Sequence, residues 1–135
     1  MLSRRYRLKR RRLIRPLFDR TRADVCSVGA GCLRLVWRFA APDDVGQDVP
    51  LQVGFAPGRR VRRAVDRNRI KRLMRTAFQQ HAGLLAERLD GRTDTLTLMV
   101  LYRSDVGQIE RVPDDLPRAL RRLVQHPCWD EAAES

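Results

Sequence analysis

Residues 66 to about 80 carry the strongest helical pattern in this chain. Apolar side chains recur there at the i, i+3, i+4 spacing of a single helical face. They are Ile70, Leu73, Met74, Ala77, Phe78 and His81. The opposite face is polar and holds Asn68, Arg72, Arg75 and Gln79, flanked by Arg69 and Lys71. A helix of this kind packs its apolar face against another layer, so the sequence predicts a sheet beneath it and a basic strip facing solvent.

Three segments show the patterns of strands. Residues 33–39 alternate between apolar and other side chains, and residues 51–55 alternate in the same way. The connection between them (AAPDDVGQDVP) is rich in turn residues, so we expect these two segments to pair as a hairpin. Residues 95–102 (TLTLMVLY) form a continuous apolar run, which is typical of a strand buried on both faces. A further short strand before Leu33 is an alternative that the pattern leaves open.

Two more helices are expected, one near each end of the chain. The first is a short helix around Pro16, which must lie in its first turn because a proline deeper inside would remove a hydrogen bond and clash. Its apolar residues are Leu13, Ile14, Leu17 and Phe18. Gly83 is expected to end the central helix. Asp114 and Asp115 suit the first turn of the last helix. The buried stripe of the last helix is Leu116, Leu120, Leu123 and Val124.

The length of 135 residues suits one domain with a single core. Residues 1–12 are expected to form a basic arm with little to bury, and residues 127–135 a loose tail. The core should therefore span about residues 13–126.

Positive charge is concentrated in two segments. Residues 1–22 hold ten basic residues against one acid and residues 59–75 hold nine against one, which gives these segments a net charge of +17. The whole chain carries +12, so the remaining residues carry −5. A solvated surface normally mixes both signs, and this segregation favours a polyanionic partner, most often nucleic acid. The alternative is a basic protein that has no such partner.

Several other classes of protein are not indicated. No apolar run approaches the length of a membrane span, and no apolar stretch of signal-peptide length follows the N-terminus. The three cysteines (Cys26, Cys32, Cys128) are odd in number and form no CxxC pair. They suggest neither a disulfide framework nor a zinc site, so we expect free thiols in a reducing cytoplasm.

No catalytic constellation is visible in the sequence. His81 lies on the apolar stripe, and His126 lies near the loose end without an obvious partner. The acids at residues 43–48 are better explained by a turn-rich loop than by a metal site. We therefore expect neither catalytic residues nor a metal site in this chain.

The stretch RRAVDRNRIKRLMRTAF, residues 62–78, closely resembles the signature of the bacterial ribonuclease P protein subunit. That family has an arginine-asparagine-arginine core followed by a basic pair, here Lys71 and Arg72. The preceding strand VGFAP, residues 53–57, and the pair Arg59-Arg60 stand where the family has a glycine-containing strand and two lysines. In the order of its elements, the resemblance runs from about residue 8 to 125.

The resemblance implies an α+β fold, a small two-layer sandwich of the ribosomal protein S5 domain 2 type. Its order is α-β-β(-β)-α-β-α, with a left-handed β-α-β crossover. It also implies a partner RNA that supplies catalysis and holds most of the Mg²⁺, and a substrate, precursor tRNA, from which the 5′ leader is removed. Two alternatives are an RNA-binding module of similar fold without a role in tRNA processing, and an autonomous nuclease, which the lack of a catalytic constellation disfavours.

The resemblance also implies two groups of site residues. The helix bearing the basic strip would face the catalytic RNA, together with the segment before it. The residues concerned are Arg59, Arg60, Arg62, Arg63, Arg67, Asn68, Arg69, Lys71, Arg72 and Arg75. A cleft between the first helix and one face of the sheet would bind the leader through Ile14, Phe18 and Trp37. Ile14 replaces an aromatic residue of the family, and Arg62 a glycine.

Overall fold

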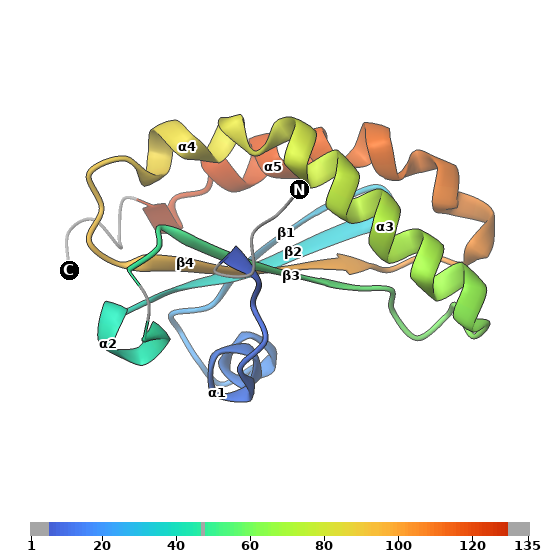
Figure 1. Cartoon of the computed structure of the whole chain (residues 1–135). Helices are drawn as coiled ribbons and strands as arrows, with labels where there is room; N and C mark the ends of the chain where they lie inside the picture. The colour runs from blue at the N-terminus through green and yellow to red at the C-terminus, as the bar shows by residue number, and fades with distance from the viewer. Residues whose placement is uncertain (1–5, 47, 130–135) are drawn as a thin grey trace.

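The computed structural model describes residues 6–46 and 48–129. Three helices cover one face of a four-stranded sheet, and short helical segments cover part of the other face (Figure 1). The elements along the chain are α1 (Arg11–Ile14), η2 (Arg15–Phe18), β1 (Cys26–Ala30), β2 (Leu33–Ala40), α2 (Pro42–Val45), β3 (Leu51–Ala56), α3 (Ala64–His81), α4 (Gly83–Leu89), β4 (Thr95–Tyr102), η3 (Val106–Arg111) and α5 (Val112–Val124). The predicted α+β class is confirmed. No helix in the two described ranges is long and apolar enough to cross a membrane.

The strands are ordered β1-β2-β4-β3 in the sheet. β1 and β2 form a hairpin that turns at Gly31, whose positive φ of 55° suits glycine. β4 lies between β2, its antiparallel neighbour, and β3, its parallel neighbour. The predicted hairpin between residues 33–39 and 51–55 is therefore wrong, because the apolar β4 takes the central position that its burial on both faces requires. The strand left open before Leu33 exists and is β1.

The connection from β3 to β4 is a left-handed crossover through α3 and α4. In Figure 1 the parallel strands β3 and β4 run from left to right, with β3 nearer the viewer, and the chain returns from right to left above the sheet. Crossovers between parallel strands are right-handed in nearly all proteins. General packing rules therefore do not predict this hand, whereas the family resemblance does.

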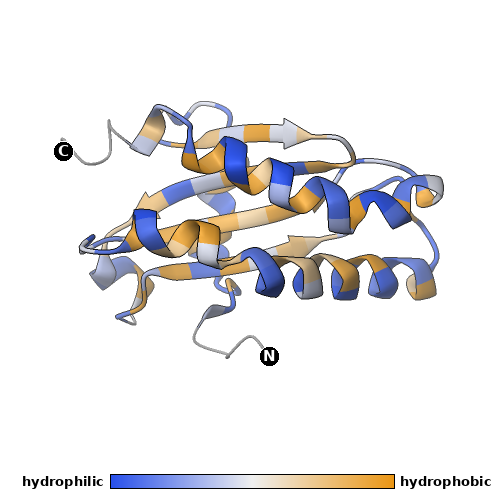
Figure 2. Cartoon of the chain, turned by 90° about the horizontal axis from the view of Figure 1, so that it is seen from above, coloured by the Kyte–Doolittle hydropathy of each residue, from blue (hydrophilic) through white to orange (hydrophobic). Residues whose placement is uncertain are grey.

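The main core lies between the sheet and the layer of α3, α4 and α5. The predicted central helix is confirmed as α3, which buries Ile70, Met74, Ala77 and Phe78 to 2% exposure or less. The last helix is confirmed as α5, which buries Leu116, Leu120 and Leu123. Figure 2 shows hydrophobic and hydrophilic residues alternating along the helices of this layer. The central helix ends at His81, just before Gly83 as expected, but a second helix, α4, begins at Gly83 itself.

A second, smaller core lies on the other face of the sheet, under α1 and η2. Leu13 and Leu17 are buried there against Val36 of β2 and Met99 of β4. Pro16 stands in the first turn of η2, where its missing N–H leaves no bond unmade. The short helix predicted around Pro16 therefore exists, although its second half is a 3-10 turn.

Both ends of the described chain pack more closely than expected. Leu8 is buried, and its backbone N–H donates to the carbonyl of Val53 at 3.0 Å, so the segment before α1 runs beside β3. Trp129 is also buried, and its indole N–H donates to the carbonyl of Leu123 at 2.7 Å. The prediction of a loose tail is thus wrong as far as residue 129, while residues 1–5 and 130–135 lie outside the described part.

A disulfide joins Cys26 at the start of β1 to Cys128, which follows α5. The expectation of free thiols is wrong for this pair and correct for Cys32, which is buried and free. The two bonded cysteines are 102 residues apart in the chain. Only the packing of α5 across the hairpin brings them together, and residue spacing gives no sign of it.

Asp115 connects α5 to the β1–β2 turn. Its carboxylate accepts a hydrogen bond from the Cys32 N–H at 3.0 Å and one from Arg118 at 3.2 Å, and its side chain is fully buried. A Cβ on Gly31 would collide with this carboxylate, so glycine is required there for space as well as for conformation. Burial alone would raise the pKa of Asp115, but the Cys32 hydrogen bonds and the charges of Arg111 and Arg118 outweigh it and hold the pKa below its usual value.

We expect Asp115→Asn to lower the free energy of unfolding by about 1.5–3 kcal/mol, because a charged hydrogen-bond acceptor is lost. A carboxyl with a lowered folded pKa stabilises the protein above its unfolded pKa and loses that contribution as the pH falls through the folded value. The wild type should therefore lose stability below about pH 4, and the variant should lack that part of the loss. Urea denaturation at pH 7 and pH 3 measures both effects.

Asp114→Asn is the matched control, since Asp114 lies in the same turn of α5 but is exposed. If both variants are equally stable at both pH values, Asp115 does not hold the hairpin.

Candidate RNA interface

The residues singled out from the sequence gather in one region of the structure, along α3 and the loop before it. Exposed side chains are Arg59, Arg60, Arg62, Arg63, Asn68, Arg69 and Arg72, and partly buried ones are Arg67, Lys71 and Arg75. We call these ten residues the basic strip. The buried stripe of α3 fixes the rotation of the helix, so its polar face points away from the sheet as predicted. Its first turn has no side-chain cap, which leaves backbone N–H groups available to an anion.

Arg67 differs from its neighbours in the strip because it binds its own loop. Its guanidinium donates to the carbonyl oxygens of Gly58 at 2.6 Å and Val61 at 2.9 Å. Gly58 has a φ of 79°, and a Cβ there would collide with the carbonyl oxygen of Tyr102. The loop therefore runs close against the end of β4. Arg67 holds it there, which positions Arg59 and Arg60 beside α3.

A groove on the α1 side of the sheet leads to this loop. It consists of two cavities of about 430 and 470 Å³ that share Phe18, Arg34 and Leu101. The first extends toward Leu17, Val25 and Val36, and the second toward Arg59, Arg67 and Arg103. We call the two cavities together the sheet groove. Because Arg59 and Arg67 belong to both surfaces, the sheet groove and the basic strip are continuous.

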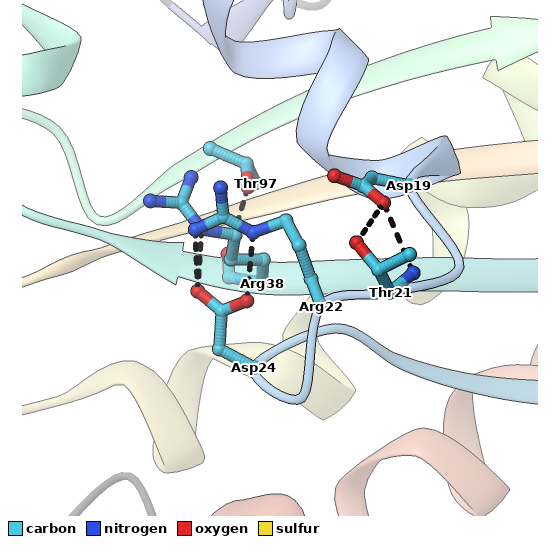
Figure 3. Close-up of polar contacts among 6 residues, drawn as sticks. All are labelled: Asp19, Thr21, Arg22, Asp24, Arg38 and Thr97. Carbon is cyan, nitrogen blue, oxygen red and sulfur yellow. Dashed lines mark hydrogen bonds and ion pairs between the residues drawn. The ribbon is translucent and has the colours of Figure 1, made fainter.

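Charge in the sheet groove is partly neutralised by Asp24. Its carboxylate accepts hydrogen bonds from Arg22 and Arg38, each with a shortest distance of 2.9 Å (Figure 3). The bond from Arg22 is the largest of the effects that hold the pKa of Asp24 well below its usual range. Arg34 makes no ion pair within the described residues and donates only a long bond of 3.4 Å to Ser27. Its guanidinium is therefore available to a phosphate group.

The nearby loop is ordered by a local turn. The Asp19 carboxylate accepts hydrogen bonds from the Thr21 N–H at 3.0 Å and the Thr21 hydroxyl at 2.6 Å (Figure 3). These bonds lower the pKa of Asp19. The turn directly follows Phe18, so it fixes the chain that carries this aromatic side chain.

Of the three residues predicted for the leader cleft, only Phe18 lines the sheet groove. Its ring is 52% exposed, which leaves a face open for stacking. Ile14 packs, partly buried, against the second core and does not line the groove. The prediction for Trp37 is wrong, because its side chain is fully buried in the main core on the helix-covered face of the sheet.

Strand alternation explains both the error and a residue that was missed. Trp37 shares its face of β2 with Leu33 and Leu35, and these point toward the helices. Arg34 lies on the opposite face and reaches the sheet groove. The signal was present in the sequence, since the alternation of residues 33–39 separates Arg34 from the apolar face. Choosing the right face required knowing which one the helices cover.

These features define the class of the molecule as a small α+β protein in which a strongly basic strip joins a groove with an exposed aromatic ring. Single-stranded RNA suits such a surface, because phosphates bind arginines and bases stack on aromatic rings.

Known proteins bear out this class. The family model described as Ribonuclease P matches residues 2–126. A Ribonuclease P protein component from Chlorobaculum tepidum is 34% identical over 104 residues, which cover 71% of this chain and 68% of that protein. The RNase P protein of Staphylococcus aureus, solved at 2.0 Å, has a similar fold, with a TM-score of 0.58 at 19% identity over 87% of this chain and 94% of that one. A mutant of the same protein with defective mRNA degradation activity matches equally well, covering 88% of each chain.

The chain belongs to the ribonuclease P protein family. A role in processing the 5′ leader of precursor tRNA follows from that membership.

We expect Arg72→Ala to weaken RNA binding and to reduce the slope of log affinity against log salt by roughly 0.7–0.9, the change for one lost phosphate contact. Thermal stability should not change, because the side chain is exposed. Arg67→Ala should also lower stability, since the carbonyls of Gly58 and Val61 lose their donor. Binding titrations at several salt concentrations, together with melting curves, measure these effects.

Arg121→Ala removes an exposed arginine of α5 and serves as the control. Equal affinities and equal salt slopes for Arg72→Ala and Arg121→Ala would contradict the assignment of the basic strip to the RNA interface.

Proposed function

We propose that this chain is the protein subunit of a cytoplasmic ribonuclease P ribonucleoprotein. The basic strip binds the catalytic RNA, and the sheet groove binds the 5′ leader of precursor tRNA. The RNA supplies catalysis and holds most of the Mg²⁺. The observation that carries this proposal is the continuity of the two surfaces at Arg59 and Arg67, which lets one protein contact both RNAs at once.

The groove suits an extended single strand of RNA. Phe18 offers an exposed ring on which a base can stack. Arg34 and Arg103 lie along the second cavity and can each meet a phosphate. Leu101 and Val36 form an apolar floor.

A reconstitution assay tests the proposal. The protein is mixed with a bacterial ribonuclease P RNA and a precursor tRNA, at a Mg²⁺ concentration too low for the RNA to act alone. We expect cleavage at the mature 5′ end only when both protein and RNA are present. Binding without cleavage would identify an RNA-binding module with another role, and cleavage by the protein alone would identify an autonomous nuclease. Either outcome would contradict the proposal.

Binding measurements on the same complex test the role of the groove separately from that of the strip. We expect Phe18→Ala to weaken binding of leader-bearing precursor by about 1–3 kcal/mol, or roughly 5- to 150-fold, because one stacked base is lost. Binding of mature tRNA should not change. Val106→Ala is the control, since Val106 is a similarly exposed apolar side chain (50%) that lies in η3, outside the groove. Equal losses for both RNAs would show that Phe18 acts through the fold.

A further inference from the structure

Three potential metal ligands meet at the end of α5, where the chain crosses the start of β1. Within the described residues, Cys26, His126 and Cys128 offer ligand atoms that all lie within 4.8 Å of one another. Cys26 comes from the edge strand, and the other two follow α5. In the structure the two sulfur atoms are bonded, so the cluster is held in its oxidised form.

The imidazole of His126 is held in place from two sides. Its Nδ1 accepts a hydrogen bond from the Cys128 N–H at 3.1 Å, so Nδ1 carries a lone pair and faces Cys128. Its ring packs edge-to-face against Trp37, with ring centroids 5.1 Å apart. Trp37 is fully buried and is the register partner of Cys26 in the β1–β2 ladder. One rigid indole therefore positions both the imidazole and the strand that carries the first thiol.

The ligand set has the chemistry of a thiophilic metal site. Two thiolates and one imidazole favour Zn²⁺ over Mg²⁺ or Ca²⁺, which prefer oxygen ligands. Tetrahedral Zn²⁺ with bonds of about 2.3 Å separates two sulfurs by about 3.8 Å. The Cα atoms of Cys26 and Cys128 are 6.8 Å apart, at the long end of the range for disulfides. The backbone thus already leaves room for the sulfurs to separate around a metal.

We propose that Cys26, His126 and Cys128 form a Zn²⁺ site when the Cys26–Cys128 bond is reduced. A thiol or phosphine reductant supplies two electrons and breaks the S–S bond to give two thiols. The hydrogen bond from the Cys128 N–H to Nδ1 breaks, which frees the lone pair of Nδ1 for the metal. Zn²⁺ then takes both thiolates and Nδ1, and the two thiols release two protons. A water molecule completes the tetrahedron. The metal fastens the end of α5 to the edge strand, as the disulfide does in the oxidised protein.

Cobalt titration tests the proposal without RNA. The whole chain, free of any affinity tag, is reduced with a phosphine and titrated with CoCl₂. We expect one equivalent of Co²⁺ to produce a thiolate-to-cobalt absorption band and the visible bands of a tetrahedral complex, which ZnCl₂ then abolishes. The oxidised protein should give neither. Absence of the thiolate band in the reduced wild type would overturn the proposal.

Cys32→Ser provides the matched control. Cys32 is a buried cysteine of the same hairpin, but it lies beside Asp115, and burial raises the pKa of its thiol to about 12. Cys32→Ser should keep the full spectrum, whereas Cys128→Ser should lose most of the thiolate band. Equal spectra for these two variants would contradict the assignment.

His126→Gln addresses the case in which a cysteine variant fails to fold. It leaves both thiols in place and should lower Zn²⁺ affinity at least about tenfold. Loss of the ring contact with Trp37 should also lower the melting temperature of the reduced apoprotein, so the quantity compared is the rise that Zn²⁺ produces within each protein. In the reduced wild type, excess ZnCl₂ should raise that temperature by several degrees. An equal rise in His126→Gln would show that the imidazole is not a ligand.

Discussion

The burial of one face of α3 against the sheet is the interaction on which the rest of the structure depends. Ile70, Met74 and Phe78 have no exposed surface, and burial of side chains of this size contributes about 1.5–3 kcal/mol each. The helix cannot rotate about its axis without exposing them. Asn68 and Arg72 are therefore directed to solvent by the packing of the opposite face. The positive charges along α3 repel one another, and the burial of the apolar face stabilises the helix against that repulsion.

The two faces of the sheet have different roles because side chains alternate along each strand. One face packs in the main core, and the other lines the groove. On β2 the odd-numbered residues from Leu33 to Trp37 fill the main core, while Arg34 and Val36 face the groove. The second core under α1 and η2 covers only part of that face. What remains open is the groove itself, and Arg67 joins it to α3 by holding the intervening loop. One short chain thus provides a groove and a basic strip that are continuous, with a single sheet between them and the main core.

Local patterns predicted the elements well and the pairing less well. The stripes of α3 and α5 follow the helical period closely, and the central position of β4 follows from its apolar run. The partner of β2 could not be predicted from spacing, since β4 is far away in sequence. The same limit applies to the disulfide, which joins residues 102 positions apart. The left-handed crossover contradicts the general rule, so only the family resemblance could predict it.

Of the candidate site, the basic strip was predicted from the sequence and most of the groove was not. The basic strip lies within residues 59–75, and the placement of its helical residues on one side of α3 follows from helical geometry. The position of the loop residues depends on the hydrogen bonds of Arg67 and was not predictable. The groove combines η2, the start of β1, β2, β4 and the loop before α3, so Arg34 and Leu101 became recognisable only in the fold. The assignment of Trp37 to the cleft followed from the family resemblance, whereas its alternation with Leu33 and Leu35 put it on the apolar face that the helices cover.

The most direct test of this account is photo-cross-linking from the face of α3. A photoreactive amino acid at Gln79, which shares the polar face with Asn68 and Arg72, reports on contact without removing a positive charge. The same group at Gln125, an exposed residue after α5, is the matched control. We expect the probe at position 79 to cross-link to ribonuclease P RNA in the reconstituted complex and the probe at position 125 not to. Cross-linking from position 125 alone, or equally from both, would contradict the orientation of α3 toward the RNA.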